Sequence, residues 1–494
     1  MPLKRTLLSV WPNRQGPRWP RWQWTACGML ACGCLFGLVG CSTNPATGRS
    51  QLTLVSEAQE QQIGLQNAEQ VAQAMPAYDD PALSAYVDGI GQTLAARSER
   101  PGLPWQFTVV DDTAINAFAL PGGYIYVTRG ILAWFNSEAE LATVLGHEIG
   151  HVTGRHSVER LSRTQLAQLG LGVGGLVYSP IADFSGLISQ GLGVLFLKYS
   201  RDDEREADML GLRYMSREGY DPESAVRVFE MLGAQRNAGE RDGTPNWLAT
   251  HPTPEDRSER LQKLIDERGA SSAGTRTGQT AYLQKIDGLM FGENPRAGFF
   301  EGEAFYHPDL AFTVQFPQGW QHQNLAQAVI SSQPDGRAAV KLAAAPGPLE
   351  DVVVAFRKQN GVSAGRARSI PGPLAGQEFS FRAQTAQGNI AGLARFVAHD
   401  GLTFRLLGLT APASFEQYAQ TFSQSLASFA ELTDPEKLAR QPQRIRIFET
   451  DRPTSLAALY AERPAAIELE TLARLNGIKA DAQLAAGTAL KWVE

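Results

Sequence analysis

Apolar residues recur at intervals of three and four over several long stretches of the chain. This is the period of a helix that buries one face. The predicted helices span 56–69, 80–98, 138–156, 202–217, 221–235 and 253–268. Two shorter apolar runs, 105–110 and 124–128, predict strands. Pro121-Gly122-Gly123 predicts a turn immediately before the second strand. Residues 41–270 are therefore expected to form a mostly helical domain with a small β-sheet.

Capping signals mark where two of these helices begin. Ser56 with Gln59, and Ser137 with Glu140, have the spacing of a capping box, in which the first side chain and the fourth satisfy the free amides of the first turn. The helix that follows Ser137 carries the residues with the clearest chemistry.

The segment 165–197 has an unusual composition. Asp183 is its only charged residue, glycine recurs through it, and Pro180 divides it into two apolar pieces. Each piece is near the lower length limit for crossing a bilayer. The pattern favours a mobile helical lid or a packed hairpin, and contact with lipid stays open as the alternative.

The C-terminal half changes composition twice. Gly, Ser, Ala and Thr dominate the start of 271–297, which predicts a linker, and 298–433 then alternates short β-like runs with helical stretches. A second polar linker is expected at 434–443. The tail, 444–494, has a strand-helix-helix-strand pattern that resembles a LysM-like module, although Arg452-Pro453-Thr454 stands where such modules usually have Gly-Asp-Thr. Peptidoglycan binding by this tail therefore stays uncertain.

The charge is distributed unevenly. The chain has 494 residues and a formal net charge of −6, yet residues 1–40 contain five Lys or Arg and no acid. The remainder holds 40 basic and 51 acidic residues. So acidic a body argues against binding the phosphate backbone of a nucleic acid.

All four cysteines lie within the first 41 residues. The rest of the chain can therefore form no disulfide framework and no thiolate metal site. The basic start, the apolar stretch 27–39 and the sequence Leu38-Val39-Gly40-Cys41 have the order of a secretory signal, and its end resembles the lipobox of bacterial lipoproteins. That resemblance implies acylation of Cys41, and Ser42 in place of Asp favours the outer membrane, with the protein facing the periplasm.

Two helical motifs supply metal-binding side chains. His147-Glu148-Ile149-Gly150-His151 places two imidazoles one turn apart on one helix face, with Glu148 beside them. On a later predicted helix, Glu204 and Asp208 are also one turn apart. A catalytic zinc site takes three protein ligands, so a carboxylate of this second helix is the candidate third ligand.

These motifs occur with others in an order that resembles the CAAX prenyl protease-like zinc metallopeptidases, metallopeptidase family 48 of the gluzincins, in their bacterial periplasmic lipoprotein branch. The further motifs are Asn116-Ala-Phe-Ala-Leu-Pro-Gly-Gly123, Gly154-Arg155-His156, and His251-Pro252 with Arg257. The resemblance implies that His147, His151 and Glu204 bind one Zn²⁺, that Glu148 is the general base, and that Asp208 orients a ligand histidine. It also implies that His251 and Arg257 lie near the open metal position.

The expected fold class is therefore multidomain. A mostly α zincin-like metallopeptidase domain with a small β-sheet is followed by an α+β domain and a small βααβ LysM-like module. The expected domains are a lipoprotein signal peptide (1–40), the zinc metallopeptidase domain (41–270), a linker (271–297), an α+β accessory domain (298–433), a linker (434–443) and the LysM-like module (444–494).

The implied chemistry is zinc-assisted hydrolysis of peptide bonds, with Arg257 or His251 helping to stabilise the oxyanion. A strand at 124–128 (Tyr124, Ile125, Tyr126, Val127 and Thr128), expected at the sheet edge, would pair with an extended substrate backbone. Such pairing favours unfolded or misassembled envelope proteins over folded ones, and outer-membrane protein quality control as the role, in contact with the assembly machinery. Two alternatives stay open: a zinc-bearing chaperone or scaffold for outer-membrane assembly, and a cell-wall binding protein.

His251 has two possible roles. Pro252 biases it towards an extended backbone and away from a helical one. The resembling branch uses a histidine at this motif as a fourth ligand in a resting state, which implies that His251 closes the site until substrate engages. In the competing role, His251 stabilises the transition state.

Overall fold

The computed structural model describes residues 41–168, 198–237, 247, 251, 257–268, 274–385 and 388–494. The predicted signal peptide at 1–40 and nearly all of the predicted lid at 165–197 lie outside this part of the chain.

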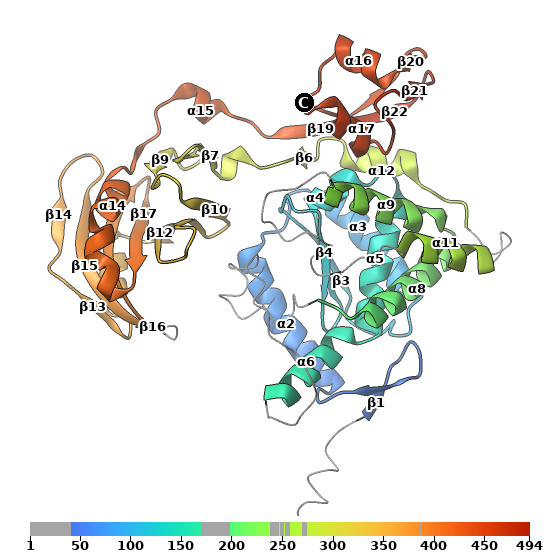
Figure 1. Ribbon diagram of the computed structural model, residues 1–494, viewed down its shortest axis with the longest axis horizontal. Coiled ribbons are helices and arrows are strands. Elements are labelled where there is room, and N and C mark those ends of the chain that lie inside the picture. The colour runs from blue at the N-terminus through green and yellow to red at the C-terminus, as the bar shows by residue number, and fades with distance from the viewer. Residues whose placement is uncertain are drawn as a thin grey trace, which may run out of the picture.

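Two packed helices form the centre of the N-terminal domain. Helix α5 (Glu138–Thr153) is buried along almost its whole length, and α8 (Arg201–Arg217) lies against it (Figure 1). A Cβ atom built on Gly150 would lie 3.0 Å from the Cα of Ala207, and one built on Gly211 would lie 2.8 Å from the backbone N of His147. Because these positions have no side chain, the two helix backbones approach closely and bring their polar residues together.

Further helices before residue 270 lie around this pair in the described part of the chain, and most of the predicted ones are confirmed. They are α2 (Glu57–Ala74), α3 (Pro81–Ala95), α4 (Arg129–Trp134), α6 (His156–Gln168), α9 (Glu223–Asn237) and α11 (Arg257–Arg268). The capping box of Ser56 and Gln59 is present. At α5, the Ser137 side chain accepts from the amide of Glu140, but the Glu140 carboxylate accepts from the amide of Asn136 instead of completing the box.

The predicted helix 138–156 is two helices. Helix α5 ends at Thr153, Arg155 takes a left-handed conformation with φ 57°, and α6 begins at His156. The reversal turns His156 back along the end of α5.

A three-stranded sheet covers one side of the helices. Its order is β3 (Gln106–Val110), β5 (Tyr124–Thr128) and β4 (Ala117–Leu120), with β3 parallel and β4 antiparallel to β5. The prediction that Tyr124–Thr128 is an edge strand is therefore wrong, because both of its sides are already paired. The N-terminal hairpin of β1 (Cys41–Thr43) and β2 (Ser50–Leu52) is a separate antiparallel pair.

The predicted linker at 271–297 is in part a piece of the N-terminal domain. Helix α12 (Gln279–Ile286) buries Tyr282, Leu283 and Ile286 in the same core as α5. The hydroxyl of Tyr282 donates to the carbonyl of Leu132 at 2.6 Å. The following strand β6 (Met290–Phe291) pairs with the C-terminal module.

The accessory domain contains two antiparallel sheets. The larger has the order β10-β11-β12-β17-β16-β15-β13, with β14 also on β15, and the smaller has the order β18-β9-β8-β7. Helix α14 (Phe415–Ala427) packs against β16 and β17, and α13 (Leu349–Arg357) contributes to a second apolar cluster on the larger sheet. This agrees with the predicted α+β composition.

The strands of the two sheets have the following bounds: β7 (Phe299–Glu301), β8 (Ala304–His307), β9 (Phe312–Gln315), β10 (Gln321–Leu325), β11 (Ala328–Ser332), β12 (Ala338–Pro346), β13 (Val362–Ala364), β14 (Arg368–Ile370), β15 (Gly376–Thr385), β16 (Gly388–His399), β17 (Leu402–Thr410) and β18 (Ala430–Glu431).

The C-terminal module has the expected strand-helix-helix-strand order. Its elements are β19 (Gln443–Glu449), β20 (Thr454–Ser455), α16 (Leu456–Glu462), α17 (Leu469–Leu475), β21 (Gln483–Leu484) and β22 (Ala489–Val493), preceded by the short helix α15 (Pro435–Ala439) within the second predicted linker. Its assignment as a LysM-like module stays a prediction.

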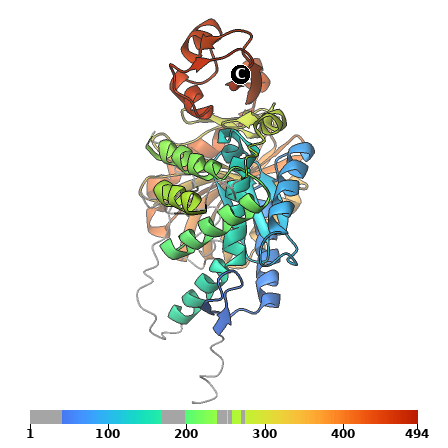
Figure 2. The same cartoon turned by 90° about the vertical axis from the view of Figure 1, so that its right-hand side faces the viewer.

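The module is docked on the N-terminal domain (Figure 2). Ile445, Leu475 and Val493 belong to the same buried cluster as α5. The fully buried Lys491 ammonium donates to the carbonyls of Ala133 (2.8 Å) and Phe135 (2.9 Å). Burial lowers the pKa of Lys491, and the nearby Glu140 carboxylate opposes that shift. Three apolar residues and one buried lysine thus hold the module against the N-terminal domain, although the sequence predicts it as a separate domain.

Among the helices that the structure describes, none combines the length and the hydropathy needed to cross a membrane.

Candidate metal centre

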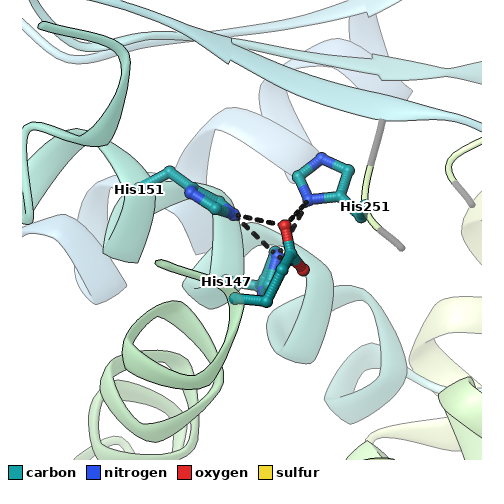
Figure 3. Close-up of side chains that lie close together, drawn as sticks. His147, His151 and His251 are labelled. Carbon is teal, nitrogen blue, oxygen red and sulfur yellow. Dashed lines mark hydrogen bonds and ion pairs between the residues drawn. The ribbon is translucent and has the colours of Figure 1, made fainter. Parts of the chain in front are cut away.

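Four buried side chains converge between α5 and α8. His147 and His151 come from α5, Glu204 comes from α8, and His251 stands ahead of α11. Each offers one ligand atom, and these four atoms all lie within 4.8 Å of one another. Figure 3 shows the three imidazoles turned towards one carboxylate. The expected ligands His147, His151 and Glu204 are therefore together, and His251 joins them.

The distances define which atoms face the centre. The Nε2 atoms of His147 and His151 are 3.0 Å apart, and each lies 3.5–3.6 Å from an oxygen of Glu204. The Nδ1 atom of His251 lies 2.9 Å from Glu204 Oε1 and 3.3 Å from His147 Nε2. The α5 histidines thus present Nε2 to the centre, and His251 presents Nδ1.

The donor set fits zinc. Imidazole nitrogen with one carboxylate is a common zinc set, whereas Ca²⁺ and Mg²⁺ prefer oxygen ligands. Burial lowers the pKa of His147 to about 4 and lowers that of His151 well below its usual range, so both rings are neutral, as metal ligands must be. Burial raises the pKa of Glu204, but His251, His151 and Arg257 hold it well below its usual value, so its carboxylate is ionised.

Glu148 lies beside this group and is fully buried. Its Oε1 accepts from the indole Nε1 of Trp247 at 3.2 Å and lies 3.6 Å from His251 Nε2. Its Oε2 has no hydrogen-bond partner within the described ranges. Burial raises the pKa of Glu148 to about 7, and the neighbouring His251 opposes the shift. A carboxyl group with this pKa can both take and return a proton near neutral pH.

Asp208 contacts His147 on the side of its ring that faces away from the centre. Its Oδ1 lies 3.0 Å from His147 Nδ1, the nitrogen that faces away from the centre. Burial raises the pKa of Asp208, but the Arg257 guanidinium and the His147 hydrogen bond hold it below its usual value. This is the geometry by which a carboxylate fixes the tautomer of a metal-binding histidine.

Arg257 is also fully buried, and its positive charge is paired with carboxylates of the site. It donates to both oxygens of Asp208 (2.5 and 2.8 Å), and its Nη1 lies 3.0 Å from Glu204 Oε2. The guanidinium also stacks over the rings of Phe229 and Trp247. The predicted oxyanion role of Arg257 stays untested, and these contacts favour a role in holding the two carboxylates.

Two aromatic residues of the site were not expected from the sequence. The Tyr199 ring stacks on His151 with centroids 3.8 Å apart, and the Trp247 ring stacks on His251 at 4.6 Å. The backbone amide of Trp247 also donates to the carbonyl of Ile115, just before β4. The sequence offers only weak signals for placing these two aromatic residues in the site. Trp247 is four residues before His251, and Tyr199 immediately precedes Ser200, the capping residue of α8.

This fold and site have the arrangement of a metallopeptidase, with candidate metal ligands on two packed helices. Residues 81–265 match the model of Peptidase family M48. The mitochondrial metalloendopeptidase OMA1 of Schizosaccharomyces pombe is 31% identical over 269 residues, which cover 52% of this chain and 76% of that protein. The chain belongs to Peptidase family M48.

Bacterial relatives also match part of the chain. The beta-barrel assembly-enhancing protease of Escherichia coli K12 is 30% identical over 223 residues, 44% of this chain and 45% of that protein. The putative beta-barrel assembly-enhancing protease of Vibrio cholerae is 34% identical over 190 residues, 37% of this chain and 39% of that protein. The chain thus spans less than half the length of these bacterial relatives.

Proposed function

We propose that this protein is a zinc-dependent endopeptidase that hydrolyses unfolded or misassembled proteins of the bacterial envelope. The observation that carries the proposal is the buried group of His147, His151, Glu204 and His251 with the Glu148 carboxylate beside it. Loss of hydrolysis with retention of zinc in a Glu148→Gln variant is the decisive test.

The chain's own residues divide the work. His147, His151 and Glu204 would hold the zinc ion, which when bound supplies a Lewis acid that polarises the scissile carbonyl and acidifies water. Glu148 takes the proton of the attacking water and delivers it to the departing amine, a transfer open to a buried carboxylate beside the metal donors. Asp208 keeps His147 in the tautomer that presents Nε2, and Arg257 keeps Asp208 in place.

The strand that would pair with substrate is β4, since β5 is central in the sheet. In the described part of the chain β4 pairs only with β5, so its other edge is the one that we assign to pairing with an extended substrate backbone, although the β4 residues are buried in this structure. Only a segment that is already unfolded or looped out can add to such an edge. This supports unfolded polypeptides as the substrate class.

The proposed location is the outer membrane, facing the periplasm. The bacterial relatives are named for enhancing β-barrel assembly, and the sequence Leu38-Val39-Gly40-Cys41 has the pattern of a lipoprotein signal. A lipid anchor would keep the protease near β-barrel proteins that fail to assemble. Contact with the assembly machinery is part of this proposal.

A Cys41→Ala variant is expected to lose its membrane attachment or to accumulate as an unprocessed precursor, because the thiol that would carry the acyl chain is gone. Cell fractionation with a high-salt wash, followed by mass spectrometry of the mature N-terminus, measures this. Ser42→Ala is the matched control and should remain membrane-bound. Correct processing and outer-membrane fractionation of Cys41→Ala would reject the lipid anchor.

We further propose that His251 restrains the enzyme at rest. His251 is 1% exposed, its Nδ1 lies among the metal ligands, and its Nε2 is 3.6 Å from Glu148. An imidazole in this place occupies a coordination position of the metal and also lies against the carboxylate of the general base. The His251 ring stacks on the Trp247 ring. Substrate that displaces His251 would therefore also have to break this stacking contact.

A His251→Ala variant is therefore expected to show raised basal proteolysis or self-cleavage, by several-fold, with about one zinc per chain retained. Cleavage of an unfolded model protein and metal analysis of the same sample measure both quantities. A role in transition-state stabilisation makes the opposite prediction. Lowered turnover with unchanged zinc would reject the restraint.

A further inference from the structure

The two α5 histidines are supported differently on the side away from the metal centre. His147 Nδ1 faces the Asp208 carboxylate directly. His151 Nδ1 instead lies 2.9 Å from Nδ1 of a third buried histidine, His156. No carboxylate of the described residues is paired with this nitrogen of His151, so its orientation depends on His156.

His156 leads on to a carboxylate. Its Nε2 lies 3.4 Å from Oε1 of Glu206, two residues after the ligand Glu204 on α8. The same Oε1 accepts from the side-chain amide of Asn44 at 2.6 Å. Asn44 is 2% exposed and follows β1, three residues after the predicted lipidation site. The result is a continuous series of polar contacts from the N-terminal hairpin to a metal ligand.

The proton positions along this series are set by chemistry. A metal on His151 Nε2 leaves the proton of the neutral ring on Nδ1, which must then donate to His156 Nδ1. His156 consequently carries its own proton on Nε2, which points at the Glu206 carboxylate. Each contact then has one donor and one acceptor, and the negative charge at the end favours electron density on His151.

The turn between α5 and α6 is shaped for these contacts. A Cβ atom on Gly154 would lie 2.5 Å from His156 Nε2 and 3.0 Å from Glu206 Oε1, so any other residue would obstruct their contact. Arg155 takes a left-handed conformation, with φ 57°, that is unfavourable for a non-glycine residue. Its guanidinium is fixed by Glu60 (2.9 Å) and by the carbonyl of Val55 (3.1 Å).

The hairpin is tied to the same turn. Gln51 of β2 donates to the carbonyl of Gly154 at 2.7 Å, and Asn44 approaches that carbonyl at 3.4 Å. The backbone of the Asn44 loop is itself ordered, since Asn44 Oδ1 accepts from the amides of Ala46 and Thr47. The hairpin thus holds both Glu206 and the turn that presents His156.

We propose that His156 and Glu206 are positioning residues that fix the tautomer and orientation of the metal ligand His151, and that Asn44 of the N-terminal hairpin holds Glu206 for this task. This inference rests on the zinc site of the proposed function and adds to it an orienting relay of Asn44, Glu206 and His156. The hairpin next to the predicted anchor is accordingly part of the metal centre's support.

The test compares zinc affinity in full-length mature protein, measured by competition with a chromogenic chelator. His156→Phe keeps a planar ring and removes both hydrogen bonds, and Glu206→Gln keeps the shape and removes the charge. We expect the zinc Kd to rise about 10–100-fold for His156→Phe and several-fold for Glu206→Gln. Asn44→Ala should give a smaller rise in the same direction. His322→Phe, in the accessory domain, is the matched control and should leave the Kd unchanged.

A second measurement separates positioning from general stability. The visible absorption bands of Co²⁺-substituted protein should shift in the relay variants, whereas the Tm of the metal-free protein should change little in Glu206→Gln. If His156→Phe fails to fold, Glu206→Gln decides the question. A zinc Kd within twofold of wild type and an unshifted Co²⁺ spectrum in the folded relay variants would overturn the relay. Absence of zinc binding by the wild type would instead reject the proposed function.

Discussion

A Glu148→Gln variant is expected to hydrolyse an unfolded envelope protein at least ~10²-fold more slowly than the wild type while retaining zinc. The amide has nearly the shape of the carboxylate but cannot accept the proton of the attacking water. The loss corresponds to about 2.7 kcal/mol or more of transition-state stabilisation. Glu148 contributes no atom to the four-residue ligand group, so its replacement leaves the metal donors intact.

The measurement is turnover of a denatured outer-membrane protein, with zinc content determined on the same preparation. Glu230→Gln is the matched control, because it makes the same chemical change on the exposed surface of α9 and should leave turnover unchanged. Trp247 donates to Glu148 Oε1, and the glutamine carbonyl can accept the same hydrogen bond, so the local packing is preserved. Turnover equal to wild type with zinc present would remove Glu148 from the mechanism.

The candidate metal ligands could be proposed from the sequence because their spacing along each helix is local. Two histidines four residues apart share a helix face whatever the rest of the fold does. The same holds for Glu204 and Asp208. Joining the two helices needed one more feature, the small residues Gly150 and Gly211 at their contact. Gly150 lies inside the predicted motif, but its packing role depends on a partner helix that periodicity does not identify.

The predictions that the structure contradicts concern contacts between segments distant in the sequence, which the local sequence does not encode. Whether Tyr124–Thr128 is an edge or a central strand depends on β3, which joins it in parallel from earlier in the chain. The composition of the 271–297 segment predicts a linker, yet Tyr282 and its neighbours fill the main core. In both cases residues distant in the sequence decide the outcome, and apolar spacing over a few residues carries no information about them.

The support of the ligands was harder still to predict. The left-handed Arg155 breaks a helical pattern that continues smoothly through 156, because its conformation is held by Glu60 from another helix. The family resemblance implies only that Arg257 lies near the open metal position, whereas its contacts with Glu204 and Asp208 depend on the packing of the start of α11 beside α8. Buried charges find partners across elements, so their roles follow the tertiary fold.

A His147→Ala/His151→Ala double variant is expected to lose zinc almost completely, from about one per chain to less than ~0.1. The change removes both α5 ligands and leaves Glu204 and His251, fewer than the three protein ligands that a catalytic zinc site uses. Because a metal that binds only the folded state stabilises it by about 4 kcal/mol at 1,000 times its Kd, zinc should raise the Tm of the wild type and not that of the variant. Elemental analysis and thermal unfolding with and without a chelator measure the two effects.

The matched control for this loss is His307→Ala/His322→Ala, which removes two histidines from the accessory domain and should keep one zinc per chain. The double variant also tests where the metal binds, because all four cysteines lie in the first 41 residues and the body offers no thiolate site. Full zinc occupancy in His147→Ala/His151→Ala would place the metal elsewhere and reject the centre. If zinc is lost but the Tm of the wild type does not depend on zinc, the ligands are correct and the buried network of Asp208 and Arg257 holds the fold without the metal.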